Sequence, residues 1–259
     1  GEDLGDDTLI IGTSGRYEFK NKGIDVFLES LNRLNRDKDL KKKVLAFVNV
    51  PSWVGDPRED LQKRLKSKDK FTEPLQCPFI THWLHNMTHD QVLDMLKYLG
   101  MGNRPEDKVK VIFVPCYQDG HDGILNKHYY DLILGEDLSV YPSYYEPWGY
   151  TPLESVAFRV PTITTDLAGF GLWVNSLKNQ HGINDGVEVL HRSDYNYSEV
   201  ADGIKDTVAL FSTKTEAEIK EIRKRAGQVA EQALWKHFIQ YYYEAYDIAL
   251  RNAMKRQLK

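Results

Sequence analysis

A basic loop near the N-terminus carries the first side chains whose types could do chemistry. Residues 15–23 read GRYEFKNKG and include Arg16 and Lys22. An apolar, strand-like run precedes this loop and an amphipathic, helix-like run follows it. Cations and the first amide groups of a helix both attract anions, so the loop favours a bound diphosphate. The alternative is a solvated turn with ordinary surface charge, because the loop is neither a GxGxxG motif nor a P-loop.

A second segment, residues 142–154, joins aromatic rings to a predicted helix start. It reads PSYYEPWGYTPLE. We expect Thr151 to cap the helix and Pro152 to occupy its first position. The backbone N–H groups of Gly149, Tyr150 and Thr151 could then point at a phosphate.

Two glutamates lie in this second segment. Glu146 is in the loop, and Glu154 is predicted in the first helical turn. A carboxylate there interacts favourably with the helix dipole and can also accept hydrogen bonds from sugar hydroxyls. The alternative is an aromatic loop packed on the core with a capping glutamate. The spacing of the two carboxylates is weak evidence, whereas the whole thirteen-residue string is specific.

The elements that must position these segments are predicted by alternating apolar runs and helical patterns, which indicate βα units around a doubly wound parallel sheet. We expect strands at 8–12, 44–48, 109–114, 138–141, 161–164 and 187–190, and helices at 24–34, 92–99, 129–134, 199–210, 216–234 and 235–253. Both reactive segments follow strands, so they belong at the carboxyl edge of the sheet, where such folds bind ligands.

The domain organisation follows from the same pattern. Residues 1–213 are predicted to form a Rossmann-like α/β domain, and residues 214–259 a helical C-terminal extension that packs on it. Residues 51–76 are rich in Pro, Gly and Lys and are interpreted as an excursion from the sheet. A capping box that begins at Thr88 is predicted to open the helix over 92–99.

Composition excludes several classes of protein. The chain has 259 residues, 41% hydrophobic and 28% charged, which is typical of a globular protein, and its net charge of -4 argues against a nucleic-acid binder. No apolar run approaches the roughly 20 residues of a membrane helix. Two isolated cysteines, Cys77 and Cys116, exclude a disulfide scaffold and favour a cytoplasmic location. No signal peptide is recognised, and the start without Met suggests a processed piece.

Both segments closely resemble the corresponding motifs of glycogen synthases of the animal and fungal type. The stretch PTITTDLAGFG at 161–171 fits the same family, while VPCY at 114–117 and LHR at 190–192 are more similar to its bacterial relatives. The resemblance spans essentially the whole chain and rests on long, specific motifs.

The resemblance implies a retaining glucosyltransferase of the GT-B type, in which two Rossmann-like domains face a cleft. The donor would be UDP-glucose and the acceptor an α-1,4-glucan, with no metal ion or other cofactor. This chain resembles the C-terminal, nucleotide-binding half. The N-terminal half, which in the family supplies further donor contacts and much of the acceptor site, would be its partner, so we expect little activity from the isolated chain.

The family motifs also imply roles for particular residues. Arg16 and Lys22 match the cationic pair that meets the charge of the leaving diphosphate. Glu154 matches the glutamate that holds the ribose hydroxyls. Glu146 lies near the transferred sugar, where it could bind a hydroxyl, stabilise positive charge or act as nucleophile; the sequence leaves these open.

Aromatic residues complete the implied donor site. Tyr129 matches an aromatic residue that stacks on uracil, and Tyr117 occupies a neighbouring aromatic position on the other side of the base. Trp148, with Gly149, Tyr150 and Thr151, belongs to the matched donor-binding segment. Because the chain has 15 tyrosines, either tyrosine could instead be a wall of the core.

Other residues are given structural interpretations. His82, His85 and His89 do not show a zinc ligand pattern, because the helix start at Thr88 separates them. The tyrosines from Tyr241 to Tyr246 are interpreted as helix packing, and in the family the last helix can cross towards the N-terminal domain. The run at 223–225 has only two arginines and lacks the extended arginine repeat of animal and fungal enzymes, so we predict no strong activation by glucose-6-phosphate.

Two other functions remain open at this point. One is a non-catalytic module that binds nucleotide or glucan. The other is a related transferase that uses ADP-glucose and the same chemistry. The sequence does not decide the oligomeric state, and a homo-oligomer remains open.

Overall fold

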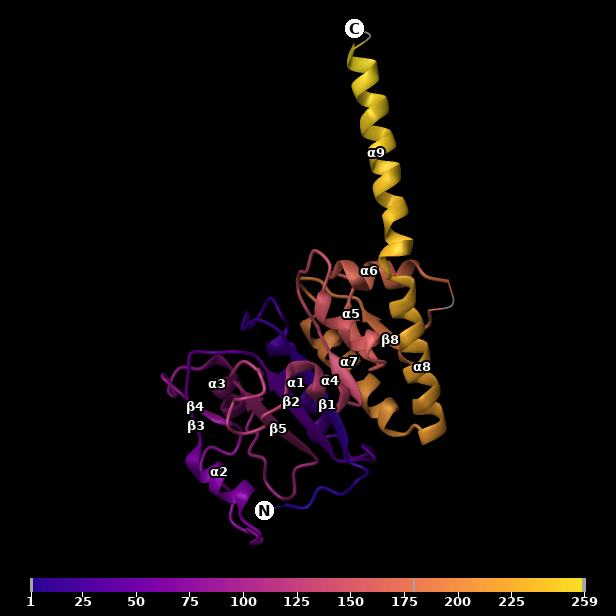
Figure 1. Cartoon of the computed structure of the whole chain (residues 1–259). Helices are drawn as coiled ribbons and strands as arrows, with labels where there is room; N and C mark the ends of the chain where they lie inside the picture. The colour runs from indigo at the N-terminus through magenta and orange to yellow at the C-terminus, as the bar shows by residue number, and fades with distance from the viewer. Residues whose placement is uncertain (1, 179, 258–259) are drawn as a thin grey trace.

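A parallel sheet of six strands forms the centre of the computed structural model, which describes residues 2–178 and 180–257 (Figure 1). The strands are β1 (Leu9–Ser14), β2 (Val44–Asn49), β5 (Val109–Val114), β6 (Leu138–Val140), β7 (Thr162–Thr165) and β8 (Val187–Leu190). Their order is β5-β2-β1-β6-β7-β8, with every pairing parallel. The predicted doubly wound α/β fold is confirmed, and each predicted strand is present.

Two groups of helices build two hydrophobic clusters on the sheet. The first group is α1 (Ile24–Asn35), α3 (Gln91–Tyr98) and α7 (Tyr197–Ser212), and the second is α5 (Tyr150–Ala157), α6 (Gly169–Ser176) and α8 (Glu216–Gln232). Fully buried residues such as Phe27, Phe113 and Phe211 belong to the first cluster, whereas Phe170 and Val174 belong to the second. The sequence pattern did not predict α6, a short and mostly apolar helix that contains two glycines.

The strand order reverses between β1 and β6, which lie side by side at the centre of the sheet. The chain winds from β1 to β2 and β5 in one direction, and from β6 to β7 and β8 in the other. Connections that leave two adjacent strands in opposite directions open a crevice at their carboxyl ends. Residues 15–23 follow β1 and residues 141–149 follow β6, so the two segments singled out in the sequence border this crevice.

The excursion between β2 and β5 contains a small two-stranded antiparallel sheet. Its strands are β3 (Val54–Pro57) and β4 (His82–Leu84), and α2 (Glu59–Lys66) lies between them. We call this sheet the β3–β4 hairpin, although a long connection joins its strands. Arg58 holds the excursion together from within, because its fully buried guanidinium donates to the carbonyls of Gln76 and Cys77 and pairs with Asp60. The sequence pattern predicted the excursion but not the secondary structure inside it.

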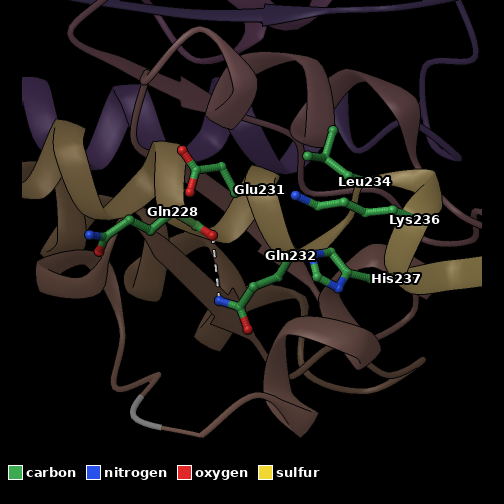
Figure 2. Close-up of a pocket in the computed structure, with 6 residues that line it drawn as sticks. All are labelled: Gln228, Glu231, Gln232, Leu234, Lys236 and His237. Atoms are coloured by element: carbon green, nitrogen blue, oxygen red, sulfur yellow. Dashed lines mark hydrogen bonds between the residues drawn. The ribbon is translucent and has the colours of Figure 1, made fainter.

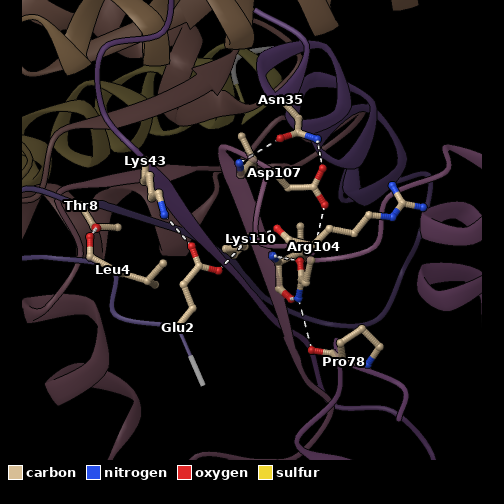
Figure 3. A network of polar contacts seen from close by, with 12 residues as sticks. Glu2, Leu4, Thr8, Asn35, Lys43, Pro78, Arg104, Asp107 and Lys110 are labelled. Atoms are coloured by element: carbon tan, nitrogen blue, oxygen red, sulfur yellow. Dashed lines mark hydrogen bonds and ion pairs between the residues drawn. The ribbon is translucent and has the colours of Figure 1, made fainter. Parts of the chain in front are cut away.

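Polar contacts protect the edge strand β5 and the adjoining end of the sheet (Figure 3). Asn103 exchanges two hydrogen bonds with Val111, at 2.8 Å each, in place of a further strand. Nearby, the Glu2 carboxylate lies between the ammonium groups of Lys43 and Lys110, at 2.5 and 2.8 Å. Because Asn103 pairs the backbone groups of Val111, this part of the strand is closed to the edge-to-edge association that an open strand invites.

Helix caps differ from the sequence-based predictions at two positions. Asp90, not Thr88, caps α3, and its carboxylate accepts from the amides of Val92 and Leu93. Gly149, not Thr151, precedes α5, because its φ of 103° suits glycine and turns the chain sharply into the helix.

The last two helices differ in how they contact the sheet domain. We expected the whole of residues 214–259 to pack on it. Helix α8 does, against α5 and the turn η1 (Ile183–Asp185). Helix α9 (Trp235–Gln257) extends away from the body, and its described side chains beyond Ile239 are all exposed (Figure 1). None of the described helices combines the length and the apolar character needed to cross a bilayer.

Glu136 is a carboxyl group buried beneath the sheet, and its pKa is expected to give stability a measurable pH dependence. Its carboxyl accepts a hydrogen bond of 2.6 Å from Ser139 and fills the space that a side chain on Gly12 would occupy. Burial raises its pKa to about 8 from 4.5. Between these values the folded state holds a proton that the unfolded state has released, so stability falls as pH rises.

We therefore expect Glu136→Gln to flatten the pH profile of stability. From about pH 5.5 to 7.5 the wild type should lose about 2–3 kcal/mol relative to the variant, since one proton contributes about 1.4 kcal/mol per pH unit. Urea unfolding at several pH values measures this difference. Parallel profiles for the two proteins would contradict the assignment.

Candidate active site

Lys22 and Glu146 form an ion pair that joins the two loops at the crevice. Their side chains are only 14% and 15% exposed, so the pair is largely shielded from water. The hydroxyl of Ser143 lies 3.3 Å from the same carboxylate oxygen of Glu146. Two predicted site residues, 124 positions apart in the sequence, are thus in direct contact.

The backbones of the two loops fit closely against each other. The amide of Tyr144 donates to the carbonyl of Asn21 at 2.7 Å. Gly23 has a φ of 68°, and a Cβ atom on it would overlap the carbonyl oxygen of Pro142. Glycine at this position therefore permits both the left-handed turn into α1 and the close approach that holds Lys22 beside Glu146.

Arg192 stabilises the loop that carries Glu146 by contacts with Pro142 and Tyr144. Its buried guanidinium donates to the carbonyl of Pro142 and lies 5.2 Å from the centre of the Tyr144 ring. Burial lowers the pKa of Arg192 and raises that of the nearby Asp25 carboxyl, while the two opposite charges act against both shifts. A buried cation of this kind positions the loop that carries Glu146.

Arg16 lies on the same loop as Lys22 but points to solvent. Its side chain is 79% exposed, and its guanidinium pairs with Glu18 at 3.0 Å. An exposed pair contributes little to stability and exchanges easily for another anion. The structure thus places Arg16 and the Glu146 loop on one edge of the sheet rather than on opposite sides of the molecule.

The segment before α5 supplies backbone donors and a packed anchor. The amides of Tyr150 and Thr151 are in the first turn of α5, where they have no partner within the helix. The indole of Trp148 lies among Phe170, Trp173 and Phe238, with ring centres 5.4–6.0 Å apart. The ring of Trp148 is therefore an anchor for the loop and not a wall of the ligand cavity.

A cavity of about 360 Å³ opens beside the contact between the two loops. Gly15, which lies next to the Lys22 side chain, is part of its lining. Its lining residues come from the ends of β1, β2 and β5 and from the starts of α4 (Tyr129–Leu134) and α5: Ser14, Gly15, Asn49, Pro51, Cys116, Tyr117, Gln118, Asp119, Tyr129 and Thr151. Tyr117, Tyr129 and Thr151, predicted from three separate segments, meet in this cavity. Its volume lies within the range typical of small-ligand sites.

The two tyrosines of the cavity differ in how firmly they are held. The hydroxyl of Tyr129 hydrogen-bonds to Ser14 at 2.8 Å, and burial raises its pKa. Tyr117 is 79% exposed. The ring of Tyr129 is therefore preorganised, whereas that of Tyr117 can adjust to a ligand.

Glu154 lies in the second turn of α5 rather than in the first, because the helix begins at Tyr150, two residues earlier than predicted. Its carboxylate accepts a hydrogen bond of 3.2 Å from Tyr130, and burial raises its pKa. Glu154 is not among the residues that line the cavity, although Tyr129, the neighbour of its hydrogen-bond donor, is.

Polar groups that sequence reasoning missed also line the cavity. Asn49 ends β2, and its amide oxygen accepts from Gln118 at 2.9 Å. Ser14 ends β1 and orients Tyr129. A polar residue at the carboxyl end of an otherwise apolar strand was the available signal, because that end borders the ligand crevice.

His82, Cys116 and Asp122 form a cluster whose ligand-type atoms lie within 4.8 Å of one another. This trio differs from the histidine trio considered in the sequence. Both ring nitrogens of His82 already hydrogen-bond, to Thr81 at 2.9 Å and to the Asp122 carbonyl at 2.7 Å. Burial raises the pKa of the Cys116 thiol to about 12, which disfavours the thiolate that a metal needs. The hydrogen bonds of His82 therefore explain why these three residues lie together, and we do not assign a metal site to them.

A wider, open hollow of about 700 Å³ lies where α8 meets α9 (Figure 2). Flexible polar side chains, among them Gln228, Glu231 and Lys236, line it, and none of the predicted site residues does. Because the smaller cavity brings together three predicted site residues and this hollow none, we place the candidate site at the smaller cavity.

Solved structures define the class to which this fold belongs. The pneumococcal O-GlcNAc transferase GtfA, solved with UDP and GlcNAc, is similar over 93% of this chain and 36% of its own, with a TM-score of 0.51 at 13% sequence identity. A six-stranded doubly wound sheet with C-terminal helices, matched in this way, has the fold of GT-B glycosyltransferases.

The sequence comparisons identify the family within this class. The family described as glycogen synthase matches residues 3–60 and 57–259, so the chain belongs to the glycogen synthase family. Glycogen [starch] synthase of Neurospora crassa is 28% identical over 96% of this chain, and isoform 2 of Saccharomyces cerevisiae is 29% identical over 98%. The chain spans 42% and 44% of the lengths of these two relatives.

Proposed function

We propose that this chain binds UDP-glucose and supplies the groups that stabilise its diphosphate during retaining transfer of glucose to an α-1,4-glucan. The observation that carries the proposal is the Lys22–Glu146 pair at the topological switch point, beside a cavity walled by Tyr117 and Tyr129. Membership of the glycogen synthase family and the likeness to a transferase solved with UDP support it.

Breaking the bond between the anomeric carbon and the diphosphate leaves negative charge on the phosphate. Lys22, Arg16 and the first amides of α5 would meet that charge without a metal ion. Preorganised donors of this kind contribute about 3–4 kcal/mol each. Arg16 would leave its exposed contact with Glu18 to do so.

We assign Glu146 to the transferred glucose. Because its carboxylate is paired with Lys22 and lies close to the Ser143 hydroxyl, it is a weak nucleophile and a well-held hydrogen-bond acceptor. It would orient a sugar hydroxyl and stabilise positive charge at the anomeric carbon. This role agrees with transfer on one face of the sugar without a covalent intermediate.

The base and the ribose would occupy the cavity and its rim. The ring of Tyr129, oriented by Ser14, would stack on uracil, with Tyr117 closing over the other face. Glu154 would accept from the ribose hydroxyls once Tyr130 releases it. Transfer itself would need a second domain to complete the cleft, so we expect little turnover by this chain alone.

Calorimetric titration with UDP, ADP and their glucose conjugates tests the proposal. Tyr129→Ala should weaken UDP binding by about 10- to 100-fold, since stacking on a base contributes about 1–3 kcal/mol. Tyr129→Phe, which keeps the ring and loses the bond to Ser14, should retain most of the affinity. Preference for ADP would indicate an ADP-glucose enzyme, and absence of any nucleotide binding would contradict the proposal.

A further inference from the structure

A second cavity, of about 230 Å³, lies next to the proposed donor site. It is lined by Tyr17, Ser52, Trp53, Leu84, Asn86, His89, Asp90 and Gln91. The same two segments line both cavities: Gly15 and Pro51 line the donor cavity, while Tyr17 and Ser52, two residues and one residue further along, line this one. A ligand here would therefore be close to the donor.

Trp53 gives this cavity an exposed aromatic wall. Its side chain is 72% exposed, and the ring of His85 lies 4.9 Å from the indole, centre to centre. The carbonyl of Trp53 accepts from the amide of His85 at 3.1 Å, so both residues are fixed to the β3–β4 hairpin. A large exposed ring on a fixed backbone that borders a cavity offers a flat apolar surface on which a ligand can stack.

The hairpin that carries Trp53 is anchored by a buried cation. The fully buried Arg58 holds the returning chain and lies 4.5 Å beneath the ring of Trp83. This support keeps the aromatic wall in place without any contact from a ligand.

Apart from Asp90, the polar side chains of the cavity are hydroxyl, amide and imidazole groups, which offer both donors and acceptors. Ser52, Asn86, His89 and Gln91 present a hydroxyl, two amides and an imidazole. The one carboxylate, Asp90, is already used, because it caps α3 and accepts from the hydroxyl of Tyr17 at 2.8 Å. The lining contains no lysine or arginine, so it does not suit a phosphate or an acidic peptide.

A sugar ring matches this lining, since a pyranose has apolar faces that lie on aromatic rings and an edge of neutral hydroxyls. The cavity is smaller than the roughly 300–1,000 Å³ of drug-sized ligand sites. It therefore suits one ring of a chain that continues into solvent.

We propose that Trp53 and the cavity beside it bind a glucose unit of the α-1,4-glucan, as a glucan subsite next to the donor. This inference rests on the proposed function for the identity of the sugar. It assigns a glucan contact to the excursion between β2 and β5, a part of the chain to which none of the motif residues belongs.

Titration with maltoheptaose and, separately, with UDP tests the subsite. Trp53→Ala should weaken maltoheptaose binding at least fivefold and leave UDP affinity within twofold of the wild type. Gln91→Ala, an exposed change that removes a hydrogen-bonding group from the same cavity, should weaken maltoheptaose binding as well. Trp235→Ala removes another exposed tryptophan, 59% exposed against 72% for Trp53, at the start of α9 and should change neither affinity.

The two titrations separate the two proposals. UDP binding without maltoheptaose binding, or equal maltoheptaose affinity in the wild type and both cavity variants, would overturn the subsite and leave the donor site standing. Maltoheptaose binding that depends on Trp53 without UDP binding would support the subsite and contradict the proposed donor function.

Discussion

Replacing Lys22 by alanine should lower glucosyl transfer by the native protein about 100- to 1,000-fold and weaken UDP binding by this chain. The variant loses a shielded cation and leaves the Glu146 carboxylate without its partner beside the proposed diphosphate site. Removing one preorganised contact to developing charge typically costs about 3–4 kcal/mol. Turnover is measured with UDP-glucose and glucan, and UDP binding by calorimetry.

Two further variants make this prediction specific. Lys20→Ala removes the same charge from an exposed position on the same loop and should have little effect. Glu146→Gln should lower turnover but keep or improve UDP affinity, because it removes a negative charge from the site. If Lys22→Ala and Lys20→Ala behave alike, Lys22 acts only through the general field of the loop, and the assigned role is wrong.

Replacing Gly23 by alanine should cost about 2–5 kcal/mol of stability and abolish most UDP binding. The left-handed φ of 68° costs about 1–2 kcal/mol for a residue with a Cβ. The added atom also overlaps the Pro142 carbonyl, so one loop must move away from the other. That movement separates Lys22 from Glu146.

Gly100 provides a matched control for this effect. Its φ is 70°, nearly that of Gly23, but nothing lies within 4 Å of the Cβ it would gain. Gly100→Ala should therefore show the conformational cost alone, about 1–2 kcal/mol, with normal UDP binding. Urea unfolding and calorimetry compare the two variants. Equal losses of stability and of affinity in both would show that the contact between the loops has no influence on the site.

The sequence by itself determined the parallel α/β sheet, the six strands and the two segments at its carboxyl edge. These depend on local signals, since buried strands read as apolar runs and the loops after them carry polar or charged residues. It also indicated Lys22 and Glu146 as site residues, through the positions of their loops after strands and through long family motifs.

Only the tertiary structure decided which of these residues meet. The ion pair between Lys22 and Glu146 depends on β1 and β6 being neighbours, which no local pattern specifies. Both Thr88 and Asp90 could cap α3 by side-chain type. The structure shows that the Asp90 side chain accepts the hydrogen bonds from the first helical amides.

The placement of the aromatic residues was likewise decided by packing. Trp148, Tyr129 and Trp53 all lie at or just before the start of a helix or strand, yet one is a core anchor, one lines the proposed donor cavity and one is exposed beside it. Aromatic rings are favoured in all three settings, because each combines a large apolar area with a polar or flat recognition surface. Which setting a ring occupies depends on the elements that the fold brings against it.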